Sequence, residues 1–289
     1  MKKALVTIFT PTYNRGYTLK RLYDSLCVQT DKNFEWIIVD DGSIDDTSVR
    51  VKEFISENKI NIRYFAQLNG GKHRAINHGV KEAVGELFFI VDSDDCLPHD
   101  AIETIKREYD TIKGDIKFAG ISGLKAYFNG AKVGGEEKWS TIDCNSLDLR
   151  YRHKVRGDMA EVMRTDVFRE FPFPEIDGEK FCPEALIWNR IATKYLIHHF
   201  YNKIYLCEYL PDGLTAKIAR LRYDSPKVSM LYYSELFNSK IPLKHKIKAS
   251  INFWRFNPTY SSQKSYNMRG FINLFCIPIG KIIRLRERK

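Results

Sequence analysis

The sequence predicts an α/β protein with a mostly parallel sheet flanked by helices, followed by a helical C-terminal extension. Apolar runs alternate with helical patterns over residues 1–120, which implies right-handed crossovers between parallel strands. The run from Leu87 to Val91 is continuously apolar, as expected for a strand covered on both faces. Two of the runs end in acid, at Asp40-Asp41 and at Asp92-Ser93-Asp94-Asp95.

The first 120 residues contain four strand and helix pairs in succession. Each strand is a short apolar run, and each is followed by a segment whose apolar residues recur at helical spacing. Leu19, Leu22 and Leu26 are an example. This alternation is typical of a Rossmann-like, doubly wound half that binds nucleotides. The expected strands are 4–9, 34–39, 62–66 and 87–91, and the expected helices are 19–26, 46–58, 72–84 and 100–113.

Regularity decreases in the second half. Asn129-Gly130 and Gly134-Gly135 interrupt a polar stretch, which indicates a long loop or hairpin up to residue 148. Two helices are expected between residues 223 and 257, separated near Pro242. The other expected elements are strands at 116–122, 159–163 and 204–206 and a helix at 183–195.

Composition narrows the class of protein. Hydrophobic residues make up 44% of the chain and charged residues 28%, which suits a globular protein with a large core. The longest apolar runs are too short for a membrane-spanning helix. The six cysteines lack the spacing of a zinc site or of a disulfide framework. We therefore expect a cytoplasmic protein.

The charge is unevenly distributed. A formal net charge of +10 favours polyanionic partners such as nucleic acid, phosphates or an anionic membrane. The excess is concentrated in residues 239–289, where Glu287 is the single acidic residue. A nucleic-acid-binding protein would carry basic and aromatic residues across its motifs, whereas the motifs here are acidic and would repel a phosphate backbone. We expect no nucleic-acid partner.

The acidic turn after the fourth strand has two interpretations from its residues alone. Ligands of parallel sheets bind at the carboxyl ends of strands, and crowded carboxylates repel one another unless a cation lies among them. Mg²⁺ and Mn²⁺ prefer such oxygen ligands. The alternative is a turn and a helix cap before Pro98 and Asp100.

Three motifs each follow an expected strand: Thr10-Pro11-Thr12-Tyr13-Asn14-Arg15, Val39-Asp40-Asp41-Gly42-Ser43 and Asp92-Ser93-Asp94. In this order they resemble the opening loop, the second motif and the Asp-x-Asp motif of family 2 glycosyltransferases, which have the GT-A fold and use nucleotide-sugar donors. The resemblance covers residues 4–215 and implies a GT-A-type sheet.

For the nucleotide-sugar donor, the resemblance implies a nucleobase pocket formed by the first two motifs. Thr10, Pro11 and Tyr13 would line this pocket. Asp41 would hydrogen-bond the edge of the base, and Asp40, beside it in the second motif, is also expected to bind the nucleotide sugar.

The third motif would take the rest of the donor. By resemblance, Asp92 and Ser93 would face the ribose. Asp94 would coordinate a divalent cofactor, Mn²⁺ or Mg²⁺, that bridges the diphosphate. Such neutralisation is what a leaving diphosphate needs as the glycosidic bond breaks.

Residues 69–79 resemble the family's third segment, with one departure. Ile76 stands where the family commonly has Arg, so that a cation is missing. Lys72 or Arg74 would replace it. Lys72 is the better candidate because it opens a helix next to Gly70-Gly71, where backbone N–H groups and an ammonium meet phosphate. Solvent-exposed cations at a helix start are the alternative.

Glycosyl transfer with inversion also needs a general base for the acceptor hydroxyl. Residues 178–190 match the family's acid-bearing segment, with Glu184 in the place of the catalytic Asp and Trp188 as the aromatic residue one turn later. Glu179 is an alternative base, and an acid in a helix's first turn is the structural alternative for Glu184. Asp158, Glu179 and Trp188 are candidates for the acceptor site.

We expect a catalytic domain at residues 1–215, with a nucleotide-sugar-binding half at 1–120 and an acceptor half at 121–215, and a helical, basic extension at 216–289. The expected reaction is metal-dependent, inverting transfer of a hexosyl or N-acetylhexosaminyl group from a UDP-sugar. The expected acceptor is a glycan or lipid-linked glycan in surface polysaccharide synthesis. A nucleotidyltransferase is the alternative, but residues 9–16 lack its glycine-rich, basic loop.

The tail has two interpretations. Apolar residues between 271 and 285 lie among basic ones, which suits an interfacial helix on anionic lipid at the inner face of the cell membrane. Pro278 and Gly280 are expected to break such a helix. A helix packed on the catalytic domain is the alternative, because apolar positions at helical spacing more often belong to a core.

Overall fold

The computed structural model describes residues 4–135, 138–209, 213, 217–258, 266, 268 and 270–287. The chain forms two compact units. The first unit comprises Met1–Pro172 and Arg190–Tyr209, and the second comprises Phe173–Asn189 and Leu210–Lys289. A segment from the middle of the chain thus belongs with the C-terminal part. The functional boundary expected at residue 215 stays a prediction.

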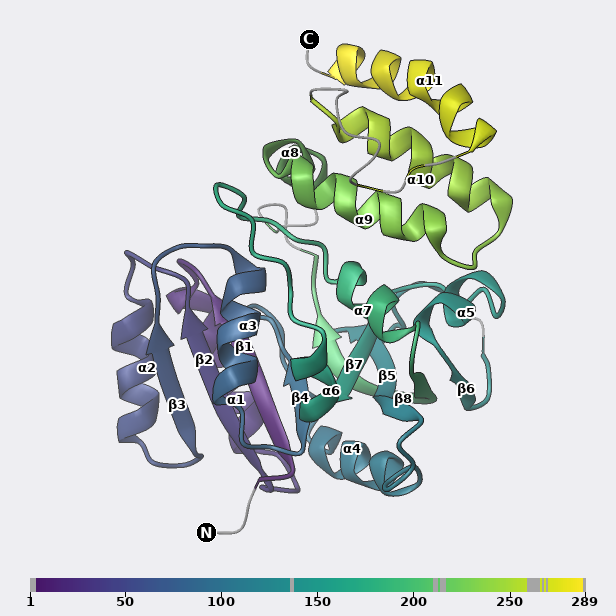
Figure 1. The fold of residues 1–289 in the computed structure, drawn as a ribbon. Coiled ribbons are helices and arrows are strands. Elements are labelled where there is room, and N and C mark those ends of the chain that lie inside the picture. Colours follow the sequence, from purple (N-terminus) through teal and green to yellow (C-terminus); the bar gives the residue numbers. More distant parts are fainter. Residues whose placement is uncertain are drawn as a thin grey trace. The chain divides into compact units, whose positions relative to one another are not determined.

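The first unit is built on one eight-stranded sheet (Figure 1). Its strands are β1 (Val6–Thr12), β2 (Phe34–Asp40), β3 (Ile62–Ala66), β4 (Leu87–Ile90), β5 (Phe118–Tyr127), β6 (Ile142–Cys144), β7 (Met159–Arg164) and β8 (Leu196–Cys207). The order across the sheet is β3-β2-β1-β4-β7-β5-β8-β6. The first four strands are parallel, whereas β7 is antiparallel to β4 and β5, and β6 is antiparallel to β8. The predicted α/β class with a mostly parallel sheet is confirmed.

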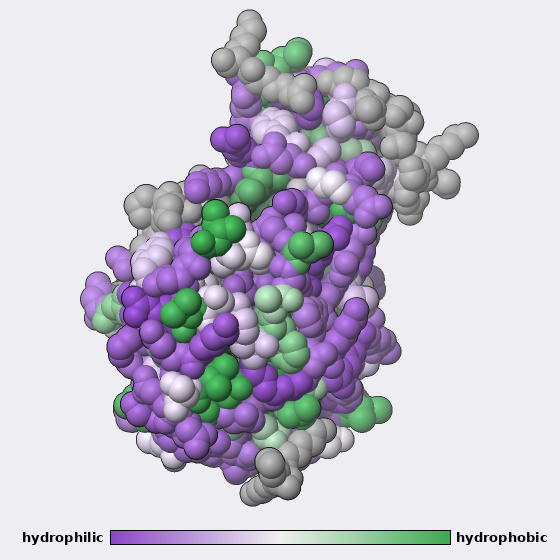
Figure 2. Space-filling view, turned by 90° about the vertical axis from the view of Figure 1, so that its left-hand side faces the viewer, coloured by the Kyte–Doolittle hydropathy of each residue, from purple (hydrophilic) through white to green (hydrophobic). Residues whose placement is uncertain are grey.

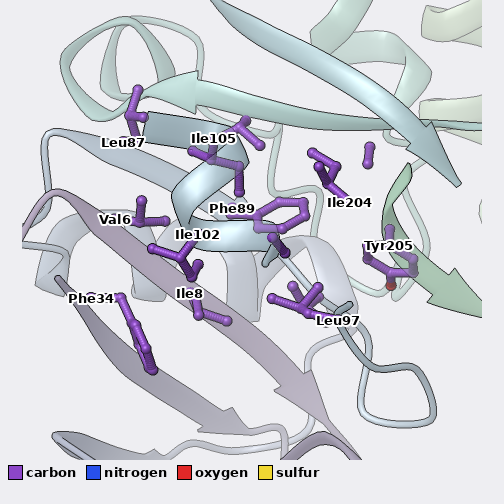
Figure 3. Packing of buried hydrophobic residues seen from close by; sticks show 14 of the residues in the cluster. Val6, Ile8, Phe34, Leu87, Phe89, Leu97, Ile102, Ile105, Ile204 and Tyr205 are labelled. Atoms are coloured by element: carbon purple, nitrogen blue, oxygen red, sulfur yellow. The ribbon is translucent and has the colours of Figure 1, made fainter. Parts of the chain in front are cut away.

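Helices of this unit pack on both faces of the sheet. They are α1 (Gly16–Cys27), α2 (Thr47–Ser56), α3 (Lys72–Glu82), α4 (Ala101–Asp110), α5 (Ser146–Tyr151) and α6 (Thr165–Glu170). On one face, Val6 and Ile8 of β1 belong to a core cluster that includes Leu22 of α1 and Ile102 of α4. Figure 3 shows Ile8, Phe89 and Ile102 in this cluster.

The other face of the sheet is covered through aromatic stacking. The ring of Phe9 stacks on Phe88 at 5.1 Å, and Phe88 stacks on Phe168 of α6 at 5.4 Å between centroids. A Cβ atom at Gly79 of α3 would lie 2.1 Å from the Phe9 ring, so only glycine lets this helix approach so closely. Successive residues of β1 are therefore buried on opposite faces, which explains its continuously apolar sequence.

The second half of the sheet differs from expectation. The helix expected at 183–195 ends earlier, because α7 spans Ala185–Ile191 and β8 begins at Leu196. The closing strand expected at 204–206 is thus the last part of a twelve-residue strand. The first half of this strand was not predicted, because the polar residues His198 and His199 interrupt the apolar pattern that indicates a buried strand. His199 lies between neighbouring strands, and burial lowers its pKa to about 3.

The second unit is helical. Besides the start of α7 it contains α8 (Ile218–Asp224), α9 (Pro226–Asn238), α10 (Leu243–Phe256) and α11 (Phe271–Glu287). Pro242 separates α9 from α10, as predicted, and Pro226 occupies the first turn of α9, where its missing N–H is tolerated. No helix in the described parts of the chain is long and apolar enough to cross a membrane.

The expectation that Pro278 and Gly280 break the tail helix is wrong. Helix α11 continues through both residues. Pro278 lies on the exposed side, where water can satisfy the carbonyl that loses its N–H partner. Gly280 lies on the buried side, where a Cβ atom would be 2.5 Å from that of Trp254. Close packing against α10 therefore needs this glycine.

Candidate active site

The acidic turn lies at the carboxyl edge of the sheet, next to the ends of β1 and β2. Phe9 pairs with Ile90, and Thr12 pairs with Asp40, so that all three motifs follow strands that end side by side. The backbone N–H of Asp92 donates to the Tyr205 hydroxyl (2.9 Å), and that hydroxyl donates to the Asp95 carboxylate (2.6 Å). Strand β8 thereby holds the acidic turn in place.

The carboxylates of this turn differ in their electrostatics. Burial by itself would raise the pKa of Asp92, but the ammonium groups of Lys72 and Lys125 hold it below its ordinary value. Burial, and then the charge on Asp92, raise the pKa of Asp94. The same two causes raise the pKa of Asp95 to about 7. Negative charge is thus crowded here and only partly compensated.

Lys72 forms an ion pair with a carboxylate of this turn. Its Nζ atom lies 2.6 Å from Oδ1 of Asp92, and both side chains remain partly exposed. Lys72 is the first residue of α3 and follows Gly71, which has a φ of 99° that favours glycine. Loop geometry therefore presents the ammonium at the same edge as the acidic turn.

Asp41 determines the shape of the loop before Lys72. Its carboxylate accepts hydrogen bonds from the backbone N–H groups of Gly70 (2.9 Å) and Gly71 (2.7 Å). The side-chain amides of Gln67 and Asn69 also donate to it, at 2.8 and 3.2 Å. Asp41 is buried and connects the second motif to the start of α3.

Asp40 and Thr10 are also bound to the framework. Asp40 accepts from the backbone N–H of Ser43 (2.8 Å) and from the hydroxyl of Tyr64 (2.7 Å). The hydroxyl of Thr10 accepts from the indole N–H of Trp36 (2.9 Å), and Thr10 is fully buried. These side chains shape the edge of the sheet, and their expected contacts with a nucleobase stay predictions.

The loops after β1 and β2 are linked to each other. The backbone N–H of Asn14 donates to Oγ of Ser43 (2.8 Å), and the Asn14 side chain accepts from the N–H of Ile44 (2.9 Å). Pro11 is buried at the end of β1, whereas Tyr13 is 49% exposed and leaves its ring accessible. Of the first motif, Tyr13 is therefore the side chain best placed for a ligand.

A divalent metal fits the donor set around Asp94. Ser93 is buried, whereas the Asp94 side chain is partly exposed. Asp92 is paired with Lys72, and Asp95 is bonded to Tyr205. The described residues contain no group of three His, Cys, Asp or Glu side chains arranged for a metal. Asp94 thus suits a cation that takes most of its other ligands from substrate or water.

Candidates for the acceptor side lie in both units. Asp158, in the first unit, accepts from the hydroxyl of Tyr209 (2.7 Å). Glu179, in the second unit, is buried and accepts from the backbone N–H groups of Lys227 (2.7 Å) and Val228 (2.9 Å). The carboxylate of Glu179 therefore caps the N-terminus of α9.

Glu184 and Trp188 lie in the same segment of the second unit. Glu184 directly precedes α7 and is partly exposed, and its carbonyl accepts from the backbone N–H of Ile187 (2.9 Å). Trp188 follows one turn later and is partly exposed as well. Both side chains thus reach the surface of their unit.

Sequence patterns did not single out three residues that lie at or near the acidic turn. Tyr205 bonds to its backbone and to Asp95, and Lys125 lies 4.1 Å from the centre of the Tyr205 ring. Arg21 donates to the backbone carbonyl of Asp94. These residues come from β8, β5 and α1 and follow no motif, so only the tertiary structure brings them together.

The sequence matches a described family and several curated relatives. Residues 7–123 match the family described as glycosyl transferase family 2. An uncharacterized glycosyltransferase of Rickettsia felis is 41% identical over 192 residues, which is 65% of this chain and 30% of that protein. Glycosyltransferase GlyA of Streptococcus pneumoniae is 37% identical over 111 residues, which is 38% of this chain and 16% of that protein. The chain thus spans less than a third of the length of these two relatives.

Solved structures resemble the whole fold. S. aureus TarS 1–349 in complex with UDP-GlcNAc has a TM-score of 0.65 at 21% identity, over 95% of this chain and 79% of that one. The mannosyltransferase PcManGT from Pyrobaculum calidifontis, in complex with GDP-Man and Mn²⁺, has a TM-score of 0.59 at 15% identity, over 100% and 89%. Residues 7–123 thus resemble glycosyl transferase family 2, and the chain has the fold of these glycosyltransferase structures, the GT-A fold.

Proposed function

We propose that this protein is an inverting glycosyltransferase that moves a sugar from a nucleoside diphosphate sugar, with UDP as the preferred nucleotide, to an acceptor hydroxyl. The observation that carries the proposal is the acidic turn Asp92–Asp95 at the carboxyl edge of the sheet, with Lys72 beside it. Such an edge can bind a ribose and a diphosphate, because carboxylate, ammonium and backbone N–H groups meet there. The similarity to TarS, whose structure holds UDP-GlcNAc, supports a UDP-sugar donor.

The chain's own groups divide the work on the donor. Asp94 would hold a Mn²⁺ or Mg²⁺ ion, which when bound supplies positive charge to the leaving diphosphate. Lys72, now paired with Asp92, would exchange that partner for a phosphate oxygen. Asp41 holds the glycine loop so that the N-terminus of α3 faces the same group.

Glu184 is the candidate for the general base. A carboxylate next to the acceptor hydroxyl takes its proton while the new glycosidic bond forms and the diphosphate leaves from the opposite side of the anomeric carbon. Glu179 is less suited to this role, because both of its oxygens accept backbone hydrogen bonds from the start of α9. Asp158 and Trp188 stay candidates for acceptor binding.

The acceptor class follows from the family resemblance. We propose a hydroxyl of a glycan or lipid-linked glycan in surface polysaccharide synthesis, reached from the cytoplasmic side. The sugar transferred would be a hexosyl or N-acetylhexosaminyl group.

A panel of nucleotide sugars tests the proposal. We expect slow hydrolysis of one UDP-sugar with release of UDP, stimulated by Mn²⁺ and abolished by chelator. Release of pyrophosphate from a nucleoside triphosphate, without turnover of any nucleotide sugar, would instead identify a nucleotidyltransferase.

A further inference from the structure

Helix α11 has one face that packs within the second unit. Asn273, Cys276, Gly280 and Arg284 are buried, at the spacing of three and four residues that defines one side of a helix. Asn273 accepts hydrogen bonds from the Ser250 hydroxyl (2.9 Å) and from the indole N–H of Trp254, both on α10. The rotation of α11 about its axis is therefore set by polar contacts as well as by close packing.

Two further contacts show how α11 lies along α10. The Cys276 thiol donates to the carbonyl of Ile247 (3.8 Å), and the Arg284 guanidinium donates to the carbonyl of Arg255 (3.1 Å). Both pairs are separated by 29 residues, so the two helices run parallel and in constant register. The opposite face of α11 is consequently directed away from α10 over its whole length.

That opposite face is apolar. Phe271 is 80% exposed, Phe275 is 73% exposed and Leu285 is 64% exposed. With Leu274, Ile279 and Ile282 they form a stripe along α11, which we call the apolar face. At 1.5 Å per residue it is about 21 Å long. Figure 2 shows the more usual arrangement, in which hydrophobic residues lie singly or in small groups within a hydrophilic surface.

The part of the sequence that contains this face is strongly basic. Residues 239–289 contain twelve Lys and Arg residues and one acid, Glu287. The Glu287 carboxylate is paired with the guanidinium of Arg255 at 2.7 Å and accepts from the hydroxyl of Tyr223. Arg286 is exposed beside the apolar face, and Lys281 is partly exposed.

We propose that the apolar face of α11 docks on the surface of an anionic lipid bilayer, with the helix lying in the interface. Exposed aromatic and aliphatic side chains enter the boundary of the acyl chains, and the cations Lys281 and Arg286 of α11 attract anionic headgroups. A second copy of this chain fits less well, because it would bring the same positive charge to the contact. Polar packing of Asn273 and Arg284 keeps the helix attached to α10 while its other face is in lipid.

Co-sedimentation of the full chain with vesicles tests this proposal. We expect binding to vesicles of phosphatidylglycerol and phosphatidylcholine, at least about tenfold weaker binding to phosphatidylcholine alone, and weaker binding at high salt. The double variant Leu274→Ser and Phe275→Ser should bind about a hundredfold less. Ile116→Ser is the matched control, since Ile116 is 77% exposed in the first unit and should not change binding.

A second variant and a second measurement keep the outcome decisive. Arg286→Gln leaves the apolar face intact, and it should weaken binding to anionic vesicles several-fold without changing the melting temperature. The proposal is overturned if the full chain binds neither type of vesicle, or if the double variant binds like the wild type. It is also overturned if sedimentation velocity shows a dimer that the double variant converts to monomer without any vesicle binding. The test does not depend on the proposed catalytic function.

Discussion

Asp92 and Asp94 lie two residues apart and are in opposite electrostatic situations. Lys72 and Lys125 compensate the charge on Asp92, whereas burial and the neighbouring Asp92 raise the pKa of Asp94. When its surroundings disfavour the ionised form of a carboxyl group, a nearby divalent cation stabilises that form most. At the scale of single residues, Asp94 is therefore the group that we propose to hold the metal.

We predict that Asp94→Asn loses the stimulation of UDP binding by Mn²⁺. The amide keeps the shape of the side chain and removes the negative charge, and the residue lies in a turn beyond the end of β4, so the fold should persist. Calorimetric titration with UDP, with and without Mn²⁺, measures the effect. Asp24→Asn, in an exposed ion pair with Lys20, is the control, and Mn²⁺-stimulated binding that survives in Asp94→Asn would contradict the assignment.

A second prediction separates the two candidates for the general base. Glu184→Gln should lower transfer by about 10²- to 10⁴-fold and leave UDP binding unchanged, because only proton acceptance is lost. Glu179→Gln should keep most activity and lower the melting temperature, because the charge at the N-terminus of α9 is removed. Steady-state kinetics and thermal melts decide between them. An inactive Glu179→Gln with an active Glu184→Gln would reverse the two roles.

At the scale of elements, the start of α3 and the course of β8 support the site. Asp41 links the end of β2 to the loop before α3, and Tyr205 links β8 to the turn after β4. At the start of α3, the backbone N–H of Gly71 donates to Asp41 at the end of β2. In β8, the buried hydroxyl of Tyr205 donates to Asp95 in the turn after β4. Positions in the chain that are far apart thus determine one edge.

We predict that Lys72→Met weakens UDP binding by about ten- to hundredfold, since a charged hydrogen bond to phosphate is lost at the N-terminus of α3. Arg74→Met is the matched control, because Arg74 lies two residues after Lys72 in the same helix. It should change the affinity for UDP by about twofold or less. Calorimetry with UDP in the presence of Mn²⁺ measures both. A larger effect for Arg74→Met would identify Arg74 as the replacement for the missing arginine.

A further prediction concerns the pH dependence that β8 carries. Burial lowers the pKa of His199 to about 3 from an ordinary value of 6.5. Between these two pH values, His199 is protonated in the unfolded chain but not in the folded chain. The free energy of unfolding therefore falls as the pH falls from 6.5 towards 3. His199→Phe should make this loss shallower in urea unfolding at pH 6.5, 5.5 and 4.5. An unchanged slope in His199→Phe would refute the prediction.

At the scale of the whole molecule, the two compact units carry different chemistry. The first contains all three motifs that follow parallel strands, and the second contains Glu179, Glu184, Trp188 and the helices α8 to α11. The second unit also contains the whole segment, 239–289, where the basic charge is concentrated. Stability of one unit and donor binding by the other can therefore be measured separately.

We predict that Asn273→Ala destabilises the second unit by about 1–3 kcal/mol, because Trp254 and Ser250 lose a buried acceptor. Urea unfolding followed by tryptophan fluorescence should show the lower midpoint, while UDP binding below the transition is retained. Asn252→Ala, at a half-exposed position on α10, is the control. If Asn273→Ala loses UDP binding at urea concentrations where its second unit is still folded, the stability of this unit and the binding of UDP cannot be measured separately.

Much of the first unit could be predicted from the sequence. Apolar runs and their spacing predicted β1 to β4 and the helices between them, because each of these elements obeys a local period. Acidic residues at the ends of two runs predicted an edge with Asp40, Asp41, Asp92 and Asp94, since carboxyl ends of parallel strands meet. In the second half, His198 and His199 hid most of β8, and local periodicity failed where burial depends on distant strands.

By itself, the sequence determined the fold class, the family resemblance and the motifs, because these depend on local periodicity and on residues adjacent in the chain. Only the tertiary structure decided that Tyr205 contacts the acidic turn, that Lys125 lies over the Tyr205 ring, and that Glu179 caps α9. It also decided that α11 both packs on α10 and exposes an apolar face, where the sequence left one or the other. The physical reason is that burial and pairing depend on which elements meet, and a one-dimensional pattern does not contain the partner.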